Sequence, residues 1–360
     1  MMNVETESGN MKQLLKTLVF DPAKFTPDDA SLAINEIMQG TATRSQISAF
    51  LVGLRLQGKD SDPTIVAACA KSMQRHARLV PYENYKHLEG NVIDIVGTGG
   101  DGHNTYNVST TASIVAAGAG AKVAKHGNRA ASSKSGSADI MEAHGCQISK
   151  VDPSQVPVIL EETNFCFLFS QIYHPAMKHV ASLRKEIGLP TVFNLLGPMS
   201  NPARPSRVVV GVHSPQIGEL MANALKLTGI NEILVVCGAE KLDEISPAGE
   251  TNFWRVHEGG EVTTGTLHPT RDFGIHTHPL EQVKGGDGHH NAEILKRLLN
   301  NELPENDPIL DFVLLNASAL LVVSGIATDF KDGVAKAKQS IKNGNAKKVL
   351  ESFKNMTIQQ

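Results

Sequence analysis

Two loops rich in glycine and hydroxyl side chains lie within Asp94–Gly145, and each follows a short β-like segment and leads into a helix-like one. The apolar segment Val92–Val96 leads into Gly97–Asp101, and Val123–Lys125 leads into His126–Ser137. Glycine allows backbone amides to close on an anion, and Ser, Thr, Asn and Lys side chains add further donors. The pattern therefore predicts two loops that bind separated phosphate groups, and the acidic Asp101 indicates an accompanying metal ion.

The first loop, Gly97–Gly102, matches the letters GxGxxG, but a dinucleotide site also needs an acid at the end of the next strand. That strand ends in Lys125-His126, and no Gly-Lys-Ser/Thr closes the loop as in a Walker motif. Asn107–Thr110 stands where the next helix should begin, which places hydroxyl donors and free amides at a positive helix end. The alternative is a turn with a purely structural role. The glycine-rich loop together with the hydroxyl residues at the start of the next helix favours phosphate binding.

The second loop carries basic residues interleaved with small polar ones, and its alternative interpretation is a flexible surface loop.

Downstream, Asp243-Glu244 follow a β-like segment; adjacent carboxylates are usually solvated, yet Mg²⁺ uses such a pair when phosphate and water complete its shell. Arg184 is either a helix-surface cation or a guanidinium that holds a planar carboxylate. The segments His276–His278 and His289-His290 lack a cysteine or acid at a familiar spacing, which argues against zinc.

Composition excludes several classes of function. With 360 residues, Lys+Arg 34 against Asp+Glu 37 and a net charge of −3, the chain has no global basic field for nucleic acid or an anionic membrane. No apolar run is long enough to span a bilayer, and Met1–Asn10 has no apolar core typical of a secretion signal. The dispersed residues Cys69, Cys146, Cys166 and Cys237 are expected to be reduced, in a cytoplasmic protein.

The order of the expected elements predicts an α/β fold with two domains. After a disordered segment 1–10, helix signals at Thr26-Pro27, Thr43–Gln46 and Asp62-Pro63 predict a small all-helical domain over 11–85. A mainly helical stretch within 154–200 is expected to complete it. Residues 90–153 and 201–355 alternate β-like and helix-like segments, which predicts a larger domain with a mostly parallel central sheet flanked by helices.

The chain resembles the anthranilate phosphoribosyltransferases from about Met11 to Phe353. Six motifs that occur in the family's order carry this resemblance: GTGGD (97–101), NVST (107–110), KHGNRAASSKSGSAD (125–139), HPAMKHVASLRKEIG (174–188), NLLGPMSNP (194–202) and LDEIS (242–246). The family architecture, shared with nucleoside phosphorylases, implies a cleft between the two domains and a homodimer. The departures are Ser170-Gln171, where Ala-Pro is common, and the aromatic Trp254.

The resemblance also implies a reaction and the residues that serve it. A pentosyltransferase would move the phosphoribosyl group from phosphoribosyl pyrophosphate (PRPP) to the amine of anthranilate, with Mg²⁺, in tryptophan biosynthesis. Lys125, Asp101 and Arg184 are the expected catalytic residues, and Ser109, Asp243 and Glu244 the metal ligands. The residues implied for anthranilate are Gly97, His126, Asn128, Arg184 and Pro198. Those implied for PRPP are Gly97, Gly100, Asp101, Thr105, Asn107, Ser109, Thr110, Lys125, Gly127, Asn128, Arg129, Ala130, Ala131, Ser132, Ser133 and Ser137.

Two other functions compete with this one. A pyrimidine nucleoside phosphorylase shares the architecture, but carries a Lys-x-Ser-Gly-Arg type segment where this chain has Lys125–Asn128. A relative that has lost catalysis and binds nucleic acid should have a basic face and a damaged metal motif, whereas LDEIS is intact here and the net charge is −3. Neither partner class, nucleic acid or membrane, is expected.

Overall fold

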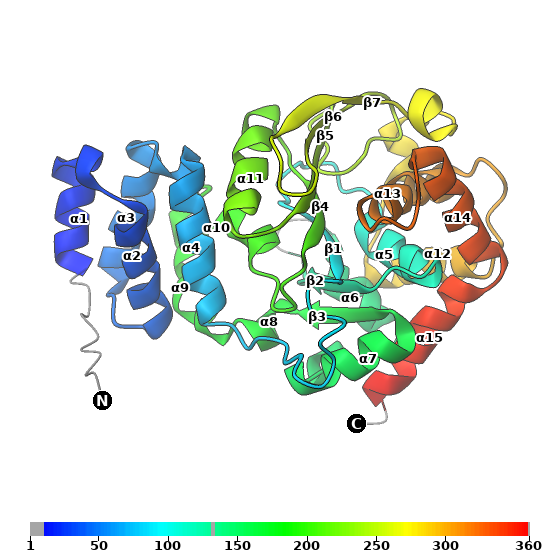
Figure 1. Ribbon diagram of the computed structural model, residues 1–360, viewed down its shortest axis with the longest axis horizontal. Coiled ribbons are helices and arrows are strands. Elements are labelled where there is room, and N and C mark those ends of the chain that lie inside the picture. The colour runs from blue at the N-terminus through cyan, green and yellow to red at the C-terminus, as the bar shows by residue number, and fades with distance from the viewer. Residues whose placement is uncertain (1–10, 131–133, 359–360) are drawn as a thin grey trace. The chain divides into compact units, whose positions relative to one another are not determined.

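The computed structural model describes residues 11–130 and 134–358 (Figure 1). The expected disorder of residues 1–10 lies outside this range. The chain divides into two compact units: the described part of residues 1–77 together with His174–Ser200, and Arg78–Tyr173 together with the described part of residues 201–360.

The first unit is a bundle of helices. It contains α1 (Met11–Phe20), α2 (Pro27–Gln39), α3 (Arg44–Leu56), α4 (Pro63–Arg75), α9 (Lys178–Ile187) and α10 (Phe193–Leu196). Thr26 and Thr43 cap α2 and α3 with reciprocal capping boxes, which satisfy amides that have no partner inside the helix. Helix α2 packs on α4, and α3 packs on α1 and α9. Apolar stripes such as Ile34 and Ile37, both 0% exposed, fill the bundle.

The second unit is built on one sheet. Its strands are β1 (Ile93–Gly97), β2 (Val123–Gly127), β3 (Phe165–Phe169), β4 (Arg207–Gly211), β5 (Glu232–Gly238), β6 (Thr251–Val256) and β7 (Thr263–Leu267). In the described residues the sheet is 7-stranded with the order β3-β2-β1-β4-β5-β6-β7. The strands from β3 to β5 are parallel, and β6 and β7 are antiparallel. The expectation of a mostly parallel sheet is confirmed.

Helices cover both faces of this sheet. The helices of this unit are α5 (Val108–Gly118), α6 (Ser137–Ala143), α7 (Val156–Thr163), α8 (Ser170–Tyr173), α11 (Pro215–Leu227), α12 (Gly288–Leu299), α13 (Pro308–Val323), α14 (Phe330–Lys342) and α15 (Asn345–Ile358). Right-handed crossovers from β1 to β2 and from β4 to β5 move in opposite directions along the sheet, so α5 and α11 take opposite faces. Helices α13, α14 and α15 pack on α5 (Figure 1).

Two strands were not expected. The stretch Ser154–Glu186 is mainly helical, as expected, but it also contains the strand β3, whose five consecutive buried residues FCFLF have no alternating pattern. The antiparallel strand β7 was not expected, since Thr263–Leu267 is largely exposed and lacks a hydrophobic period. No described helix is both long and apolar enough to cross a membrane.

Candidate functional site

The predicted phosphate loops lie at the carboxyl ends of adjacent parallel strands. The first follows β1, the second follows β2, and Asp243-Glu244 follow β5, with β4 between β1 and β5. The chain passes from β1 to β2 on one side and reaches β4 on the other, so the strand order reverses between β1 and β4. Ligands of open α/β sheets bind outside the carboxyl ends at such a reversal.

Glycines let the first loop close around Asp243. The backbone amide of Gly99 donates to Asp243 Oδ2 over 2.7 Å, and the amide of Thr98 donates to the carbonyl of Gly211. A β-carbon on Gly97 would lie 2.3 Å from Asp243 Oδ2, and one on Gly211 would lie 1.5 Å from the Asp243 carbonyl oxygen. Gly99 and Gly100 have φ of +70° and +90°, the left-handed region that glycine tolerates. The loop is therefore shaped by close backbone approach.

The start of α5 brings hydroxyl groups to the same place. Helix α5 begins at Val108 after Asn107, so Ser109 and Thr110 lie in its first turn. The Ser109 hydroxyl hydrogen-bonds to the Glu244 carboxylate. Thr110 is 0% exposed, and its hydroxyl has no hydrogen-bond partner in the described residues. A helix N-terminus with such donors suits an oxyanion.

Three carboxylates from two distant segments meet beside these donors. Asp101 and Asp243 share a side-chain hydrogen bond, and Glu244 lies close enough to interact with both. Burial, and after it the negative charge of Asp101, raises the pKa of Asp243. Burial and the charge of Asp243 likewise raise the pKa of Glu244 well above its usual value. A cation would relieve this repulsion.

The described residues form no cluster of three or more His, Cys, Asp or Glu side chains that could hold a metal by themselves. Asp243 and Glu244 nevertheless fit Mg²⁺, because this ion is commonly held by one or two carboxylates together with phosphate oxygens and water. The serine hydroxyl of Ser109 already contacts one of the two carboxylates. The sequence-predicted ligand set is thus brought together in the fold.

Lys125 lies in the middle of β2, the strand that leads into the second loop. Its side chain is 2% exposed, and its Nζ donates to the Ile95 carbonyl over 2.7 Å. Burial lowers the pKa of the Lys125 ammonium, while the charges of Asp94 and Glu244 oppose that shift. Burial raises the pKa of Asp94 to about 6, although Asn201 Nδ2 donates to this carboxylate over 2.8 Å. The neighbouring His126 is 7% exposed, and its amide donates to Asp94.

The second loop folds back on the start of α6. The Asn128 amide donates to the Ser137 hydroxyl, and a β-carbon on Gly127 would lie 2.2 Å from the same oxygen. Arg129 pairs with Glu142 through two hydrogen bonds of 3.1 and 2.7 Å and lies over the Phe169 ring. The predicted ligands Ala131, Ser132 and Ser133 lie outside the described residues.

Thr105 forms a bridge to Lys284, which fixes the segment between the first loop and α5. The Ser170-Gln171 departure lies at the start of α8, where Gln171 Nε2 is 3.5 Å from Asn128 Oδ1. Trp254 is in β6 and packs on Gly218 of α11, where a β-carbon would lie 2.3 Å from the indole. Trp254 therefore serves the packing between helix and sheet.

Arg184 and Pro198 belong to the first unit. Arg184 is half-buried in α9, its guanidinium lies 5.8 Å from the centre of the Phe193 ring, and its Nη2 donates to Asn194 Oδ1 over 3.4 Å. No carboxylate in the described part of this unit pairs with Arg184, and burial lowers the pKa of its guanidinium. An unpaired, partly desolvated guanidinium is suited to a carboxylate ligand. Pro198 is buried in the turn that follows α10.

Sequence reasoning missed Asp139, which holds the ends of the second loop together. Its Oδ2 accepts from the Ala130 amide over 2.9 Å and from the Gly136 amide over 2.7 Å. Asp139 is the third residue of α6 after the cap Gly136, so a capping-box pattern could have identified it. Asn201 and Asn291 gave no local signal, because their partners are far away in the sequence: Asn201 bonds to Asp94 of β1 and Ala124 of β2, and Asn291 bonds to Asn107.

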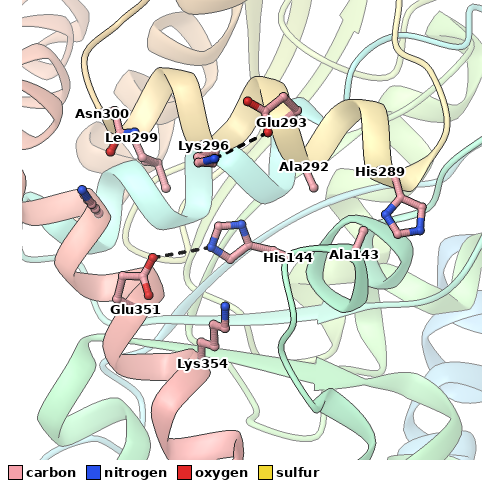
Figure 2. A pocket seen from close by; sticks show the side chains of 11 residues that line it. Ala143, His144, His289, Ala292, Glu293, Lys296, Leu299, Asn300, Glu351 and Lys354 are labelled. Atoms are coloured by element: carbon pink, nitrogen blue, oxygen red, sulfur yellow. Dashed lines mark ion pairs between the residues drawn. The ribbon is translucent and has the colours of Figure 1, made fainter.

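A cavity of about 460 Å³ lies elsewhere in the second unit, among α6, α12 and α15 (Figure 2). His144, Lys296, Glu351 and Lys354 extend into it, and a 3.8 Å ion pair joins His144 to Glu351. None of the sequence-predicted site residues lines this cavity. It is thus separate from the residues gathered at the strand ends.

Family models match both units. Residues 89–347 match the family described as "Glycosyl transferase family, a/b domain", and residues 12–77 match its "helical bundle domain". The chain therefore contains both domains of this glycosyl transferase family.

Comparison with individual relatives shows which enzymes of this glycosyl transferase family the chain is similar to. An anthranilate phosphoribosyltransferase of Schizosaccharomyces pombe is 42% identical over 91% of this chain and 91% of its own length. That of Saccharomyces cerevisiae, solved in complex with PRPP and Mg, matches with a TM-score of 0.88 and 34% identity over 97% of this chain and 98% of its own. That of Thermus thermophilus matches with a TM-score of 0.86 and 38% identity over 96% and 98%. This chain belongs to the anthranilate phosphoribosyltransferase family.

Proposed function

We propose that this chain transfers the 5-phosphoribosyl group of PRPP to the amine of anthranilate. The products are N-(5-phosphoribosyl)anthranilate and pyrophosphate, as in tryptophan biosynthesis, and the reaction depends on Mg²⁺. The observation that carries the proposal is the convergence of Asp243 on the Gly97–Asp101 loop and of Glu244 on Ser109. Family membership and the yeast relative solved with PRPP and Mg support it.

The donor substrate is assigned to the second unit. The amides of the first loop and the first turn of α5 would bind one phosphate region, and the Asn128–Ser137 loop would bind the other. Asp243, Glu244 and Ser109 would hold Mg²⁺, which neutralises charge that develops on the departing pyrophosphate. Lys125 places a buried positive charge below the same loops. Preorganised donors of this kind stabilise developing charge without reorganisation.

Acceptor-binding roles are assigned to Arg184 and Pro198 within the first unit, and to Asn128 and His126 within the second. The guanidinium of Arg184 would hold the anthranilate carboxylate, because it lacks a carboxylate partner in the described part of its own unit. The amine needs no general base, since an aryl amine is already neutral at pH 7. The barrier lies in loss of a highly charged leaving group from the sugar, with an oxocarbenium-like transition state. Orientation of the amine toward the anomeric carbon is therefore what the acceptor residues contribute.

We further propose that the chain works as a homodimer in the cytoplasm. Phe20 of α1 and Leu56 of α3, 78% and 79% exposed, are the most exposed large apolar side chains of the described residues, and both lie in the first unit. The four cysteines are free and buried, which suits a reducing compartment. Light scattering after gel filtration should give twice the 38.6 kDa chain mass, and Phe20→Glu with Leu56→Glu should shift it to the monomer. A monomeric wild type would refute the dimer.

The decisive experiment follows loss of anthranilate fluorescence with PRPP and Mg²⁺. We expect rapid loss that requires all three components, and none after chelation of the metal. The same preparation should leave thymidine and inorganic phosphate unchanged, which a pyrimidine nucleoside phosphorylase would not do. A folded protein that leaves anthranilate untouched would sink the proposal.

A further inference from the structure

Asn291 of α12 is a buried polar residue that contacts the phosphate-binding region without belonging to either loop. It is 1% exposed, and its Nδ2 donates to Asn107 Oδ1 over 2.8 Å. The residues are 184 positions apart in the sequence. Asn107 precedes α5, in the segment predicted to bind PRPP.

Asn107 in turn joins the two loops. Its Nδ2 donates to the Ser135 carbonyl over 3.0 Å, and the Ser135 hydroxyl donates to Asn107 Oδ1 over 3.0 Å. Ser135 belongs to the second loop and is 8% exposed. The Asn107 carboxamide is therefore a link that sets the spacing between the first loop region and the second.

Asn291 can hold that carboxamide in only one orientation. Its own Oδ1 accepts from the Gly286 amide over 2.8 Å, so its Nδ2 faces Asn107 and also donates to the Gly286 carbonyl over 3.3 Å. The chain before α12 is itself bound to the same region, since the Tyr106 amide donates to the Val283 carbonyl and the Gly285 amide to the Asn104 carbonyl. The backbone just before Asn291 is therefore hydrogen-bonded to the segment that contains Asn107.

We propose that Asn291 is a positioning residue for PRPP binding, which acts by orienting the Asn107 carboxamide and so fixing the distance between the two phosphate loops. This inference rests on the proposed function. It adds a residue of α12 to the site, although α12 contributes none of the predicted ligands. Asn291 is buried and Asn107 is partly buried, and a hydrogen-bonded network of such side-chain amides favours a single geometry.

The test compares Asn291→Ala with Asn291→Asp, by titration calorimetry of PRPP with Mg²⁺ and by steady-state kinetics. Alanine removes one hydrogen bond to Asn107, and we expect PRPP to bind about tenfold more weakly. Aspartate still accepts from the Gly286 amide but presents an acceptor to Asn107 Oδ1, so binding should weaken by more than alanine does. The KM for anthranilate should change by less than about twofold, since only donor binding is affected.

A weaker effect of aspartate than of alanine on PRPP binding would overturn the proposal. So would unchanged PRPP affinity in both variants. Ser135→Ala should couple with Asn291→Ala, because both residues donate to the same oxygen. Additive effects of these two changes would also contradict the shared link.

The added charge of aspartate needs its own control. His289 is exposed on the side of α12 that lines the cavity of Figure 2, so His289→Asp adds a similar charge without touching Asn107. We expect less than about a threefold change in PRPP affinity, as for surface charges in general. A wild type that neither binds PRPP nor consumes anthranilate would refute the proposed function itself. Activity in the wild type with no effect at Asn291 would refute only this inference.

Discussion

At the scale of single residues, the site depends on charges that the fold keeps close together. Asp101, Asp243 and Glu244 interact so that the pKa values of Asp243 and Glu244 rise, and Lys125 is buried below them. Like-charged groups held together in this way are costly unless a cation joins them. Arg184 shows the complementary case, a partly buried cation that lacks a carboxylate in the described part of its own unit.

The metal assignment predicts the effect of a double change. Asp243→Asn with Glu244→Gln keeps the volume of both side chains but removes their charge, so activity should need at least about tenfold more Mg²⁺ and kcat should fall. Titration of initial rates with Mg²⁺ measures this. Glu240→Gln, in the same loop, is the matched control. An unchanged Mg²⁺ titration in the double variant would show that the metal assignment is wrong.

The acceptor assignment makes a prediction for Arg184→Ala. Loss of a charge-assisted hydrogen bond to the substrate carboxylate should raise the KM for anthranilate by about tenfold to a hundredfold. The KM for PRPP should stay within about twofold. Lys185→Ala, the exposed neighbour in α9, should alter neither constant. Equal effects of Arg184→Ala on both substrates would refute the carboxylate role.

At the scale of elements, the helices behind the sheet hold the phosphate-binding turn in place. Helix α5, which begins at the first loop, packs on α13 and α15. Gly118 at its end approaches so closely that a β-carbon would lie 2.5 Å from the Ala346 amide of α15. The C-terminal helix thereby supports the site from a distance, through the rigid body of α5.

Truncation of a core side chain in α15 should test this support. Phe353 is 0% exposed and meets Phe165 of β3 edge-on, with ring centres 5.2 Å apart. Phe353→Ala should lower the free energy of unfolding by about 3–5 kcal/mol, because the cavity cannot collapse fully in a packed core. Urea denaturation measures this change. Leu227→Ala, at an exposed apolar position of α11, should cost less than about 1 kcal/mol, and equal losses would contradict the packing described.

At the scale of the whole molecule, two compact units share one chain, and the first is completed by His174–Ser200, which lies between two segments of the second. Its members α9 and α10 therefore follow β3 and α8 in the chain, so the bundle is built from two separate stretches of sequence. His174, at the point where the chain enters the first unit, is 5% exposed.

This histidine predicts how stability depends on pH. Burial lowers the pKa of His174 to about 4, below the value of about 6.5 in an unfolded chain. The unfolded state therefore binds the proton first, so stability is present above pH 6.5 and is lost as the pH falls toward 4. When the pH is lowered from about 7.5 to about 4.5, the free energy of unfolding should fall in both proteins. The fall should be about 2 kcal/mol smaller in His174→Gln than in the wild type. Urea denaturation at both pH values measures this, and parallel losses in the two proteins would contradict it.

Much of this organisation can be predicted from local sequence. Capping residues such as Thr26 and Thr43 act within one helical turn, so they mark helix starts directly. Glycines and hydroxyl residues after short apolar runs indicated the two loops for the same reason. Strand β3 was not predicted, because a fully buried strand lacks the alternation of apolar and polar residues that distinguishes a strand from a buried helix. The family motifs supplied roles that spacing alone left open.

The sequence by itself determined the types of chemical group: phosphate-binding loops, an acidic pair and a lone arginine. Only the tertiary structure decided which of them meet, because pairing across the sheet joins residues that are far apart in the chain. Asp243 reaches Gly99 across 144 positions, and Asn291 reaches Asn107 across 184. Hydrogen bonds act over about 3 Å and leave no local signature in the sequence at such separations, so the positioning residues became visible only in the fold.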